Sequence, residues 1–480
     1  MKDDSRFLLP GTSVRNGALD RRRLLKLGGG LAAAAVGARA LGGSAFAQGA
    51  TPAASPMASP VPIPKYKTDT SISGDIQFWH FWGSPVRRSA VQRIIAQFNQ
   101  VYPNIKVTET AIPFSDIWNK NLAAVAAGSG MPNVIVEDRP SLPERAKNNV
   151  EMDLGDLCTR DGITGDAFWP FTWVEATRYN NTPYGLPYET DIRVVYYNKA
   201  AFTEAGLDPN TPPKNWDDLA SFSDKLDQKD GNQLKRIGFF PTFGNVGIDQ
   251  WAWNNGGHWE DKDYNATFTL PANVDALKWE KTWADRYGFP NVQALQSTFG
   301  SGTQDGFMSG KVAMTVDIQG YTSQLNFFNP KFTLPDKDEN LGYGVAPITP
   351  APGHEPASLS GGFALSIPVG SDQVDASWEF IKFMTFVGQG SWARDTYAMP
   401  TVEALAYDPV LAVSPNWEFF LQAMAYGRPK EYNPYYPNFT GDLLPNAELA
   451  VLSGDASAED ALKDAQQKAQ KEIDRVRGEG

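Results

Sequence analysis

The sequence predicts an α/β protein with parallel sheets whose faces are covered by helices. Short runs of β-branched and aromatic residues alternate with segments in which apolar residues recur at helical spacing, and this alternation is typical of that fold class. The chain has 480 residues, of which 42% are hydrophobic and 12% aromatic. It can therefore bury the core of one large or two medium domains.

The first elements alternate as strand, helix, strand, helix and strand. In chain order they are a strand from 76 that leads into the aromatic cluster 79–82, a helix over 91–98, a strand over 105–107, a helix over 115–128 and a strand over 134–136. Tyr102-Pro103 ends the first helix because proline has no amide hydrogen with which to continue it. Ser115 can cap the second helix and Gly128 can end it.

The alternation continues to the end of the chain. The later elements are strands over 193–197, 312–316 and 363–367, a helix that starts at Asn215, a buried helix over 377–386 and an amphipathic helix over 459–475. Asn215 is a suitable cap because Asp218 follows three residues later. No short-period repeat interrupts this order.

The charge and the scarcity of cysteine and histidine exclude several classes of function. The net charge is −12, and the first 47 residues carry eight Lys/Arg against three Asp, so the rest of the chain carries 35 basic and 52 acidic side chains. This excess of acid disfavours nucleic acid and anionic membranes as partners. With one cysteine, Cys158, and three histidines, we expect no disulfide framework, no metal and no cofactor. We also expect a monomer.

The N-terminal residues 1–47 resemble a twin-arginine signal peptide. Arg21-Arg22-Arg23 precedes an apolar stretch over 27–41, and Ala45-Phe46-Ala47 offers a cleavage site. The alternative is a basic disordered tail. Residues 48–73 are rich in Pro, Ala and Ser and are expected to form a flexible linker. We predict an exported protein, at the periplasmic or extracellular face of the cytoplasmic membrane, without a lipid-anchor cysteine.

Several short motifs occur in a characteristic order. They are PYGLP at 183–187, VYYNK at 195–199, AGL at 205–207, WDDL at 216–219, the run 307–314, SGG at 360–362, WEFI at 378–381 and LSG at 452–454. Together they resemble family 1 of the extracellular solute-binding proteins, the group that contains maltose-binding and other sugar-binding proteins. The resemblance covers nearly everything from 74 to 473.

The resemblance implies a two-lobed periplasmic-binding-protein fold of type II, with the ligand held in a cleft between the lobes. Lobe I would comprise 74–190 and 362–409, and lobe II would comprise 191–361 and 410–475. It also implies a function without catalysis. The protein would bind a carbohydrate as the extracytoplasmic component of an ABC importer and deliver it to the permease subunits in the membrane.

Two groups of candidate ligand-binding residues follow predicted strands, where ligands of open α/β sheets bind. His80 and Trp82 end the first strand, and the period-2 alternation favours them over their neighbours Trp79 and Phe81 as the outward-facing residues. Glu137, Asp138 and Arg139 follow the third strand. The resemblance implies a carboxylate there, and the alternative is a solvated turn.

The remaining candidates surround the two crossings between the implied lobes. At the first crossing they are Glu189 and Asp191, with Thr190 and Arg193 nearby; at the second they are Gly361 and Gly362; elsewhere they are Trp251, Trp253, Tyr321 and Trp392. The resemblance places a ligand carboxylate at Asp191, and an ion pair with Arg193 is the alternative. Trp251 and Trp253 would share a face if extended, and the alternative is a core position. Glycine would let the backbone approach a ligand, and an ordinary turn is the alternative.

Two other functions remain open at this point. A secreted glycoside-active enzyme could use carboxylate pairs such as Glu137/Asp138 or Glu189/Asp191, although such enzymes usually take the two carboxyls from separate strands. A binding protein for another polar solute, such as glycerol-phosphate, is the second alternative. The 14 Trp and 17 Tyr favour carbohydrate, because aromatic rings stack on the C–H faces of sugars.

Overall fold

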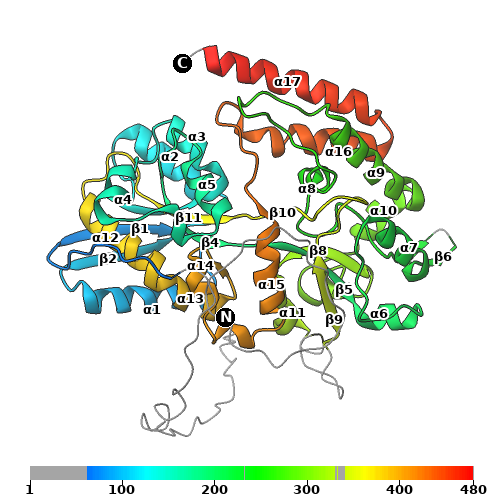
Figure 1. The fold of residues 1–480 in the computed structure, drawn as a ribbon, viewed down its shortest axis with the longest axis horizontal. Helices are drawn as coiled ribbons and strands as arrows, with labels where there is room; N and C mark the ends of the chain where they lie inside the picture. Colours follow the sequence, from blue (N-terminus) through cyan, green and yellow to red (C-terminus); the bar gives the residue numbers. More distant parts are fainter. Residues whose placement is uncertain (1–61, 232, 330–331, 333–340, 479–480) are drawn as a thin grey trace, which may run out of the picture. The chain divides into compact units, whose positions relative to one another are not determined.

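The computed structural model describes residues 62–231, 233–329, 332 and 341–478 (Figure 1). The predicted signal peptide and most of the predicted linker lie outside these residues. Both α-helices and β-sheets are present, so the predicted α/β class is confirmed. No helix of the described part combines the length and apolarity needed to cross a membrane.

The first sheet has six strands in the order β12-β4-β11-β3-β1-β2. Its strands are β1 (Gly74–His80), β2 (Ile105–Ala111), β3 (Val134–Asp138), β4 (Leu186–Thr190), β11 (Gly362–Ser366) and β12 (Met399–Pro400). β1 pairs in parallel with β2 and β3, whereas β11 is antiparallel to both β3 and β4. The sheet is therefore mixed rather than wholly parallel, because β11 enters it from the later part of the chain.

Helices cover both faces of the first sheet. One face packs on α1 (Pro85–Val101), α12 (Val374–Phe383) and α13 (Gln389–Thr396), whose apolar residues form a single core with the strands. The other face packs on α2 (Ile117–Ala127), α3 (Leu142–Lys147) and α5 (Pro170–Thr177). Figure 1 shows α1 and α2 on opposite sides of β1 and β2.

The second sheet has the order β8-β5-β9, and both of its pairings are antiparallel. Its strands are β5 (Arg193–Asn198), β8 (Met314–Ile318) and β9 (Tyr343–Pro347). Its helices are α6 (Lys199–Glu204), α7 (Trp216–Leu226), α8 (Ile248–Trp253), α9 (Pro271–Tyr287), α10 (Phe289–Gln296), α11 (Tyr321–Phe328), α16 (Leu443–Ser453) and α17 (Ala458–Gly478). The sequence predicts a parallel sheet for this half, whereas the three strands form an antiparallel sheet. Strand alternation with helices does not determine direction when long insertions separate the strands.

The remaining strands and α-helices are short. They are α4 (Gly155–Asp161), β6 (Gln228–Asp230), β7 (Gln233–Arg236), β10 (Ser358–Leu359), α14 (Glu403–Ala406), α15 (Trp417–Ala423) and β13 (Gly427–Arg428). β10 pairs in parallel with β13, so a segment that leads into the first sheet lies beside a segment from the C-terminal part of the chain.

The last residues of the predicted linker lie on the first half of the molecule. The Tyr66 ring stacks on Phe386 at a centroid distance of 4.5 Å. The Lys67 backbone N–H donates to the Asp161 carbonyl oxygen, and the Lys382 ammonium donates to the Lys67 carbonyl oxygen. These contacts place the end of the predicted linker against the first half, where Tyr66 supplies apolar surface that Pro, Ala and Ser do not.

Candidate functional site

One edge of the first sheet gathers several strand ends. Asp138, at the end of β3, is opposite Phe363, and Thr190, at the end of β4, is opposite Gly362. β1 runs parallel to β3 and also ends at this edge, with His80. The chain passes from here to the second sheet at 190–193 and returns at 358–362. We call this edge the crossing edge.

Four aromatic side chains form a shelf at the crossing edge, made of Phe81, Phe114, Trp118 and Phe363. The Phe81 ring lies 4.7 Å from Phe363 and 5.0 Å from Phe114, and the Phe114 ring lies 4.8 Å from Trp118, between ring centroids. Trp118 Nε1 donates to the Val136 carbonyl oxygen at 3.1 Å, which orients its ring. Phe114 is 54% exposed. The shelf therefore offers an aromatic face beside the crossings.

The sequence does not predict the shelf, because the predicted alternation along β1 assigns His80 and Trp82 to the outward face and Phe81 to the core. His80 and Trp82 are fully buried, on the same side as Phe78, whereas Trp79 and Phe81 are partly exposed. The Trp82 ring packs against Trp392 and Tyr188, at centroid distances of 4.4 and 5.5 Å. Period-2 alternation separates the two faces of a strand but does not say which one the tertiary structure covers.

His80 has a structural environment. Its Nδ1 accepts a hydrogen bond from the Trp82 backbone N–H at 3.2 Å, so the ring proton is on Nε2, which donates to Glu109 at 2.9 Å. Burial lowers the pKa of His80, and the hydrogen bond to Glu109 opposes this shift only in part. The prediction that His80 faces a ligand is therefore corrected to a buried neutral histidine.

Arg139 is fully buried and binds both crossings at once. Its guanidinium donates to Glu175 and to backbone carbonyl oxygens on each crossing, those of Glu189 at 3.0 Å and Ser360 at 3.2 Å. Glu175 in turn accepts the Lys430 backbone N–H at 2.8 Å. The structure thus places Arg139 among protein acceptors rather than facing an open site, which corrects its predicted role.

Glu137 forms a buried carboxyl pair with Glu151. Asn121 Nδ2 donates to Glu151 at 2.7 Å and to Glu137 at 3.5 Å, and Arg145 Nε lies 3.9 Å from Glu137. Burial raises the pKa of Glu137 to about 7 and that of Glu151 well above its ordinary value. Two buried carboxyls in contact hold a proton between them. Glu137 is therefore a core residue and not the exposed ligand contact that was predicted.

Asp138 and Glu189 are two further carboxyl groups at or next to the crossing edge. Asp138 accepts a hydrogen bond from Ser141 at 2.7 Å. Glu189 accepts one from Trp392 Nε1 at 2.9 Å, and burial raises its pKa while Arg87 lowers it. Trp392 itself is buried, so its predicted contact with a ligand is replaced by this support of Glu189.

Asp191 lies at the first crossing, directly before β5. One of its oxygens accepts the Gly361 backbone N–H at 2.8 Å and Arg193 NH1 at 2.6 Å. Its side chain keeps 18% of its surface exposed. The ion pair with Arg193, which is the alternative role that the sequence offers for Asp191, is present. It orients the carboxylate between the two crossings.

The glycines of the second crossing serve close packing of the backbone. Gly362 has φ +119°, and a Cβ at this position would overlap the Glu189 carbonyl oxygen on the paired strand. Gly361 donates to Asp191 and accepts from Arg139. The sequence predicts that these glycines let the backbone approach a ligand. In the structure they let it approach the backbone of the first crossing.

Trp251 and Trp253 are core residues of α8. Trp251 Nε1 donates to the Pro241 carbonyl oxygen at 2.9 Å, and Trp253 Nε1 donates to Glu431 at 3.3 Å. Both rings are buried. The predicted shared face required an extended segment, and in a helix residues two apart point in different directions. The alternative reading, a core position, is the correct one.

Tyr321 lies in a small polar pocket of about 140 Å³ in the second half. Its hydroxyl donates to Asp305 at 2.6 Å. Asp317 and Gln296 also line this pocket, and burial raises the pKa of Asp317 to about 7. Asp191 and Arg193 both act on the Asp317 carboxyl electrostatically, which places this pocket close to the first crossing.

A larger pocket, of about 700 Å³, has walls from both halves. Ser84, Val86 and Arg87 contribute from the loop and helix that follow β1. Residues 395–397 contribute from the end of α13, and residues 323, 324 and 326–328 contribute from α11.

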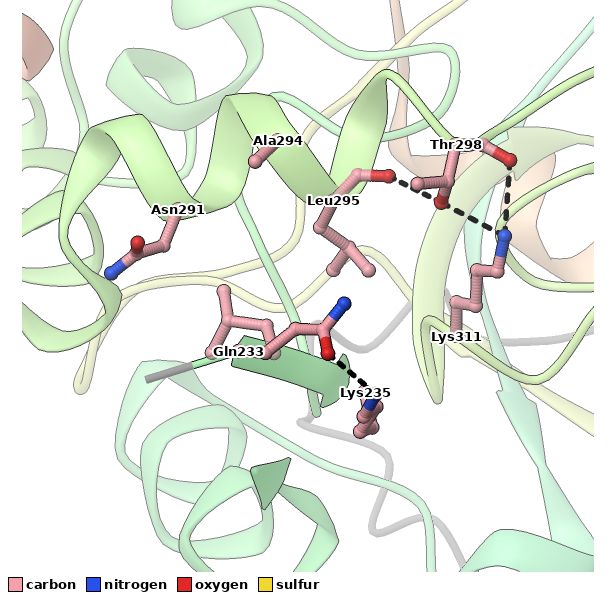
Figure 2. Close-up of a pocket in the computed structure, with 8 residues that line it drawn as sticks. Gln233, Lys235, Asn291, Ala294, Leu295, Thr298 and Lys311 are labelled. Carbon is pink, nitrogen blue, oxygen red and sulfur yellow. Dashed lines mark hydrogen bonds between the residues drawn. The ribbon is translucent and has the colours of Figure 1, made fainter. Parts of the chain in front are cut away.

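A third pocket, of about 530 Å³, lies between β7 and α10 in the second half (Figure 2). Its two lysines are engaged with neighbouring groups. Lys235 donates to Gln233 at 2.6 Å, and Lys311 donates to the Thr298 carbonyl and hydroxyl oxygens at 3.0 and 2.8 Å. This pocket contains no residue of the first half, so it does not extend the crossing edge.

Similar proteins are solute-binding proteins. The chain is 28% identical to CpMnBP1, solved with mannotriose bound, with a TM-score of 0.70 over 82% of this chain and 99% of that chain. It is 25% identical to an ABC transporter solute-binding protein from Thermotoga lettingae TMO, solved with alpha-D-tagatose, with a TM-score of 0.68 over 84% and 100%. It is 24% identical over 354 residues to the sn-glycerol-3-phosphate-binding periplasmic protein UgpB of Escherichia coli (strain K12), covering 69% of this chain and 75% of the relative.

The match to the sequence model of one protein family shows which family the chain belongs to. The model of the bacterial extracellular solute-binding proteins matches residues 82–390, which is more than half of the chain. The predicted family and its two-lobed type II fold are thereby confirmed. The chain belongs to the family of bacterial extracellular solute-binding proteins.

Proposed function

We propose that this protein is the extracytoplasmic binding component of an ABC importer and that it binds a carbohydrate at the crossing edge. The observation that carries the proposal is the partly exposed aromatic shelf of Phe81, Phe114, Trp118 and Phe363, which lies beside the carboxyl groups of Glu189 and Asp191 at the first crossing. The solved relatives that bind mannotriose and tagatose support a sugar as the ligand.

The chemistry of the edge suits the two surfaces of a sugar. A ring face of C–H groups stacks on an aromatic side chain, for about 0.5–1.5 kcal/mol beyond the burial of area. Hydroxyl groups donate to carboxylates such as Glu189 and Asp191, for roughly 1.5–3 kcal/mol each. The shelf and these carboxylates together provide both kinds of contact that a sugar makes.

The charges at the edge favour a neutral ligand over glycerol-phosphate. Arg139 and Arg193 are the buried cations of the crossings, and each uses Nε and both terminal nitrogens on protein acceptors. Asp191, the carboxylate paired with Arg193, repels a phosphate. The similarity to UgpB therefore supports the assignment to the solute-binding proteins more than it supports glycerol-phosphate as the ligand of this chain.

The binding mechanism follows from two halves joined by the crossings. We assign 74–190 and 362–409 to lobe I, and 191–361 and 410–475 to lobe II. A sugar that contacts both lobes stabilises the closed arrangement by its difference in affinity for the two states, and the closed form then docks on the permease. Export is directed by residues 1–47 as a twin-arginine signal. This assignment is supported by the extracellular family of the chain.

The test measures ligand specificity directly. Purified protein is titrated by calorimetry and thermal shift with mannotriose, mannobiose, maltose, tagatose and sn-glycerol 3-phosphate. At a sugar concentration a hundred times Kd, stabilisation by roughly 2.7 kcal/mol is expected, with no shift from sn-glycerol 3-phosphate. Binding of the phosphate without any sugar would refute the proposal.

Two controls sharpen this test. Phe114→Ala should weaken sugar binding about two- to tenfold through loss of stacking, whereas Val410→Ala should not change it. The two residues are similarly exposed, at 54% and 55%, but Val410 lies outside the shelf. A reducing-sugar assay checks the enzyme alternative, and no release from an oligosaccharide is expected.

A further inference from the structure

We infer that Glu280, Glu448 and Asp249 form a pH-sensitive latch, which holds α16 against α9 and α8 in acid and releases it as the pH rises. We call these three residues the carboxyl cluster. They lie in the second half, away from the crossing edge, so the inference does not depend on which solute binds.

The carboxyl cluster lies where three helices meet. α16 packs against α8, α9 and α17 (Figure 1). Glu280, on α9, is fully buried, and Ala276 and Leu277 on the same helix belong to the apolar core of this half. Glu448 on α16 and Asp249 on α8 are half-buried. The charges of both act on the Glu280 carboxyl, so the three acidic groups lie close together.

No base balances the carboxyl cluster. Within the described part of the chain, no N–H or hydroxyl group donates to either oxygen of Glu280 or to Oε1 of Glu448, and no Lys or Arg lowers the pKa of either group. Burial raises the pKa of Glu448, and burial together with the charge of Glu448 raises that of Glu280 well above its ordinary value. Since an unpaired buried charge is costly, the two carboxyls stay neutral by keeping protons.

The other charged groups on these helices are engaged elsewhere. Lys278 of α9 pairs with Glu459 of α17 at 2.5 Å, and both side chains are about half exposed. Lys281 pairs with Asp285, one turn further along α9. α10, which also packs on α9, carries no titratable side chain. Among the described residues, no group of three or more Asp, Glu, His or Cys has an arrangement that could hold a metal ion. Protons therefore neutralise the carboxyl cluster.

Loss of these protons favours separation of the helices. Because the folded pKa of Glu280 and Glu448 lies above the ordinary value of 4.5, their contribution to the packing of α16 is complete below pH 4.5 and is lost as the pH rises through the folded pKa. The ionised groups then repel each other. α17 has supports that do not titrate, such as the hydrogen bond from the Ala266 backbone N–H to Gln470 at 2.9 Å. α16 is therefore the helix that we expect to loosen.

Hydrogen exchange followed by mass spectrometry tests the latch in the full chain. Exchange of residues 443–453 is measured at pH 5.5 and pH 8.5, and each rate is divided by the intrinsic chemical rate at that pH. In the wild type we expect the corrected rate to be about tenfold higher or more at pH 8.5, since each unit by which a pKa is raised changes such an equilibrium tenfold.

Three variants assign the effect to the carboxyl cluster. Glu448→Gln should reduce the ratio of the two corrected rates, and Glu280→Gln combined with Glu448→Gln should abolish it, because an amide cannot ionise. Glu459→Gln is the matched control on the outer side of the same helices. It should keep the wild-type ratio, because the hydrogen bond with Lys278 lowers the pKa of Glu459 and keeps this group ionised at both pH values.

The outcomes are decisive for the latch alone. Equal corrected rates at the two pH values in the wild type, or a wild-type ratio in Glu448→Gln, would overturn it. Protection restored at pH 8.5 by calcium would also overturn it, in favour of a cation site. Because Glu448 is half-buried, Glu448→Gln should fold, and circular dichroism checks this. Sugar affinity at pH 5.5 should be the same in all variants, so failure of the latch leaves the proposed function standing.

Discussion

A single guanidinium, that of Arg139, joins segments that are far apart in the chain. It donates to Glu175, to the Glu189 carbonyl oxygen on the first crossing and to the Ser360 carbonyl oxygen on the second. Because Glu175 also accepts the Lys430 backbone N–H, the Arg139–Glu175 ion pair connects a third segment of the chain to the two crossings. At the scale of the residue, stability near the hinge depends on the planar fork of arginine.

We predict that Arg139→Gln lowers the free energy of unfolding by about 3–5 kcal/mol, because it leaves Glu175 as a buried charge without its partner. Arg139→Lys should recover part of this loss, since it restores the charge but not the fork. Urea denaturation of the three proteins measures both effects. Equal stability of Arg139→Gln and the wild type would contradict the structural role.

The Glu137/Glu151 pair predicts a pH dependence of stability. The folded pKa of Glu137, about 7, lies above its ordinary value of 4.5, so the folded state binds more protons between these values. The free energy of unfolding therefore includes a contribution that is complete below pH 4.5 and is lost as the pH rises to about 7. Above that pH the contribution of this group stays constant.

Glu137→Gln should remove part of this slope, because the amide mimics the protonated carboxyl and cannot ionise. We expect the melting temperature of the variant to fall less than that of the wild type between pH 5 and pH 7. Thermal unfolding at half-unit steps of pH measures the difference. Asp75→Asn, on an exposed position of β1, serves as the control and should keep the wild-type slope.

At the scale of the element, β1 shows how one strand supplies both a core and a binding face. Its inward side chains continue from Phe78 through His80 to Trp82, and its outward side chains lead from Trp79 to Phe81 of the shelf. The shelf is completed by the start of α2 and the start of β11. The binding face is therefore an assembly of three segments.

This division predicts opposite effects of two aromatic truncations. Trp82→Ala should destabilise the ligand-free protein by about 3–5 kcal/mol, because it leaves a cavity between Tyr188 and Trp392. Phe114→Ala should leave the free energy of unfolding within about 0.5 kcal/mol of the wild type, because the ring is exposed. Denaturant unfolding without sugar compares them. A stable Trp82→Ala variant that had lost sugar binding would return Trp82 to the site.

At the scale of the whole molecule, the proposed function depends on the two halves changing their arrangement when ligand binds. The crossings pass between separate sheets, each with its own core, and a third apolar cluster joins Phe171 and Met399 of the first half to Val194 and Tyr196 of the second. Hinge motion can therefore leave the two main cores intact while the third cluster repacks. A ligand shifts such an equilibrium only as far as its affinities for the two states differ. The proposed sugar therefore has to contact both halves.

We predict that the sugar that gives the largest thermal shift decreases the radius of gyration. Small-angle X-ray scattering of the same preparation, with and without saturating sugar, measures the change. sn-Glycerol 3-phosphate at equal concentration is the control and should leave the scattering unchanged. If the radius stays constant at saturating sugar, the binding mechanism by closure is wrong.

The sequence by itself determined the α/β class, the family and the positions of the eleven strands and helices that it predicted. Hydrophobic periodicity and capping residues act within a few residues of chain, and Asn215, for example, caps α7 by accepting the Asp218 backbone N–H, as predicted. The short motifs also suffice for the family, because the family model matches residues 82–390, which contain all of them except LSG at 452–454. These properties are local, and local sequence encodes them.

Only the tertiary structure decided which side chains face the candidate site. The phase of β1, the helical state of Trp251 and Trp253 and the burial of Arg139 all depend on partners that are distant in the sequence. The shelf brings together Phe81, Phe114, Trp118 and Phe363, which no local pattern connects. The physical reason is that periodicity sets the spacing of side chains, whereas burial by remote segments sets the face that remains open.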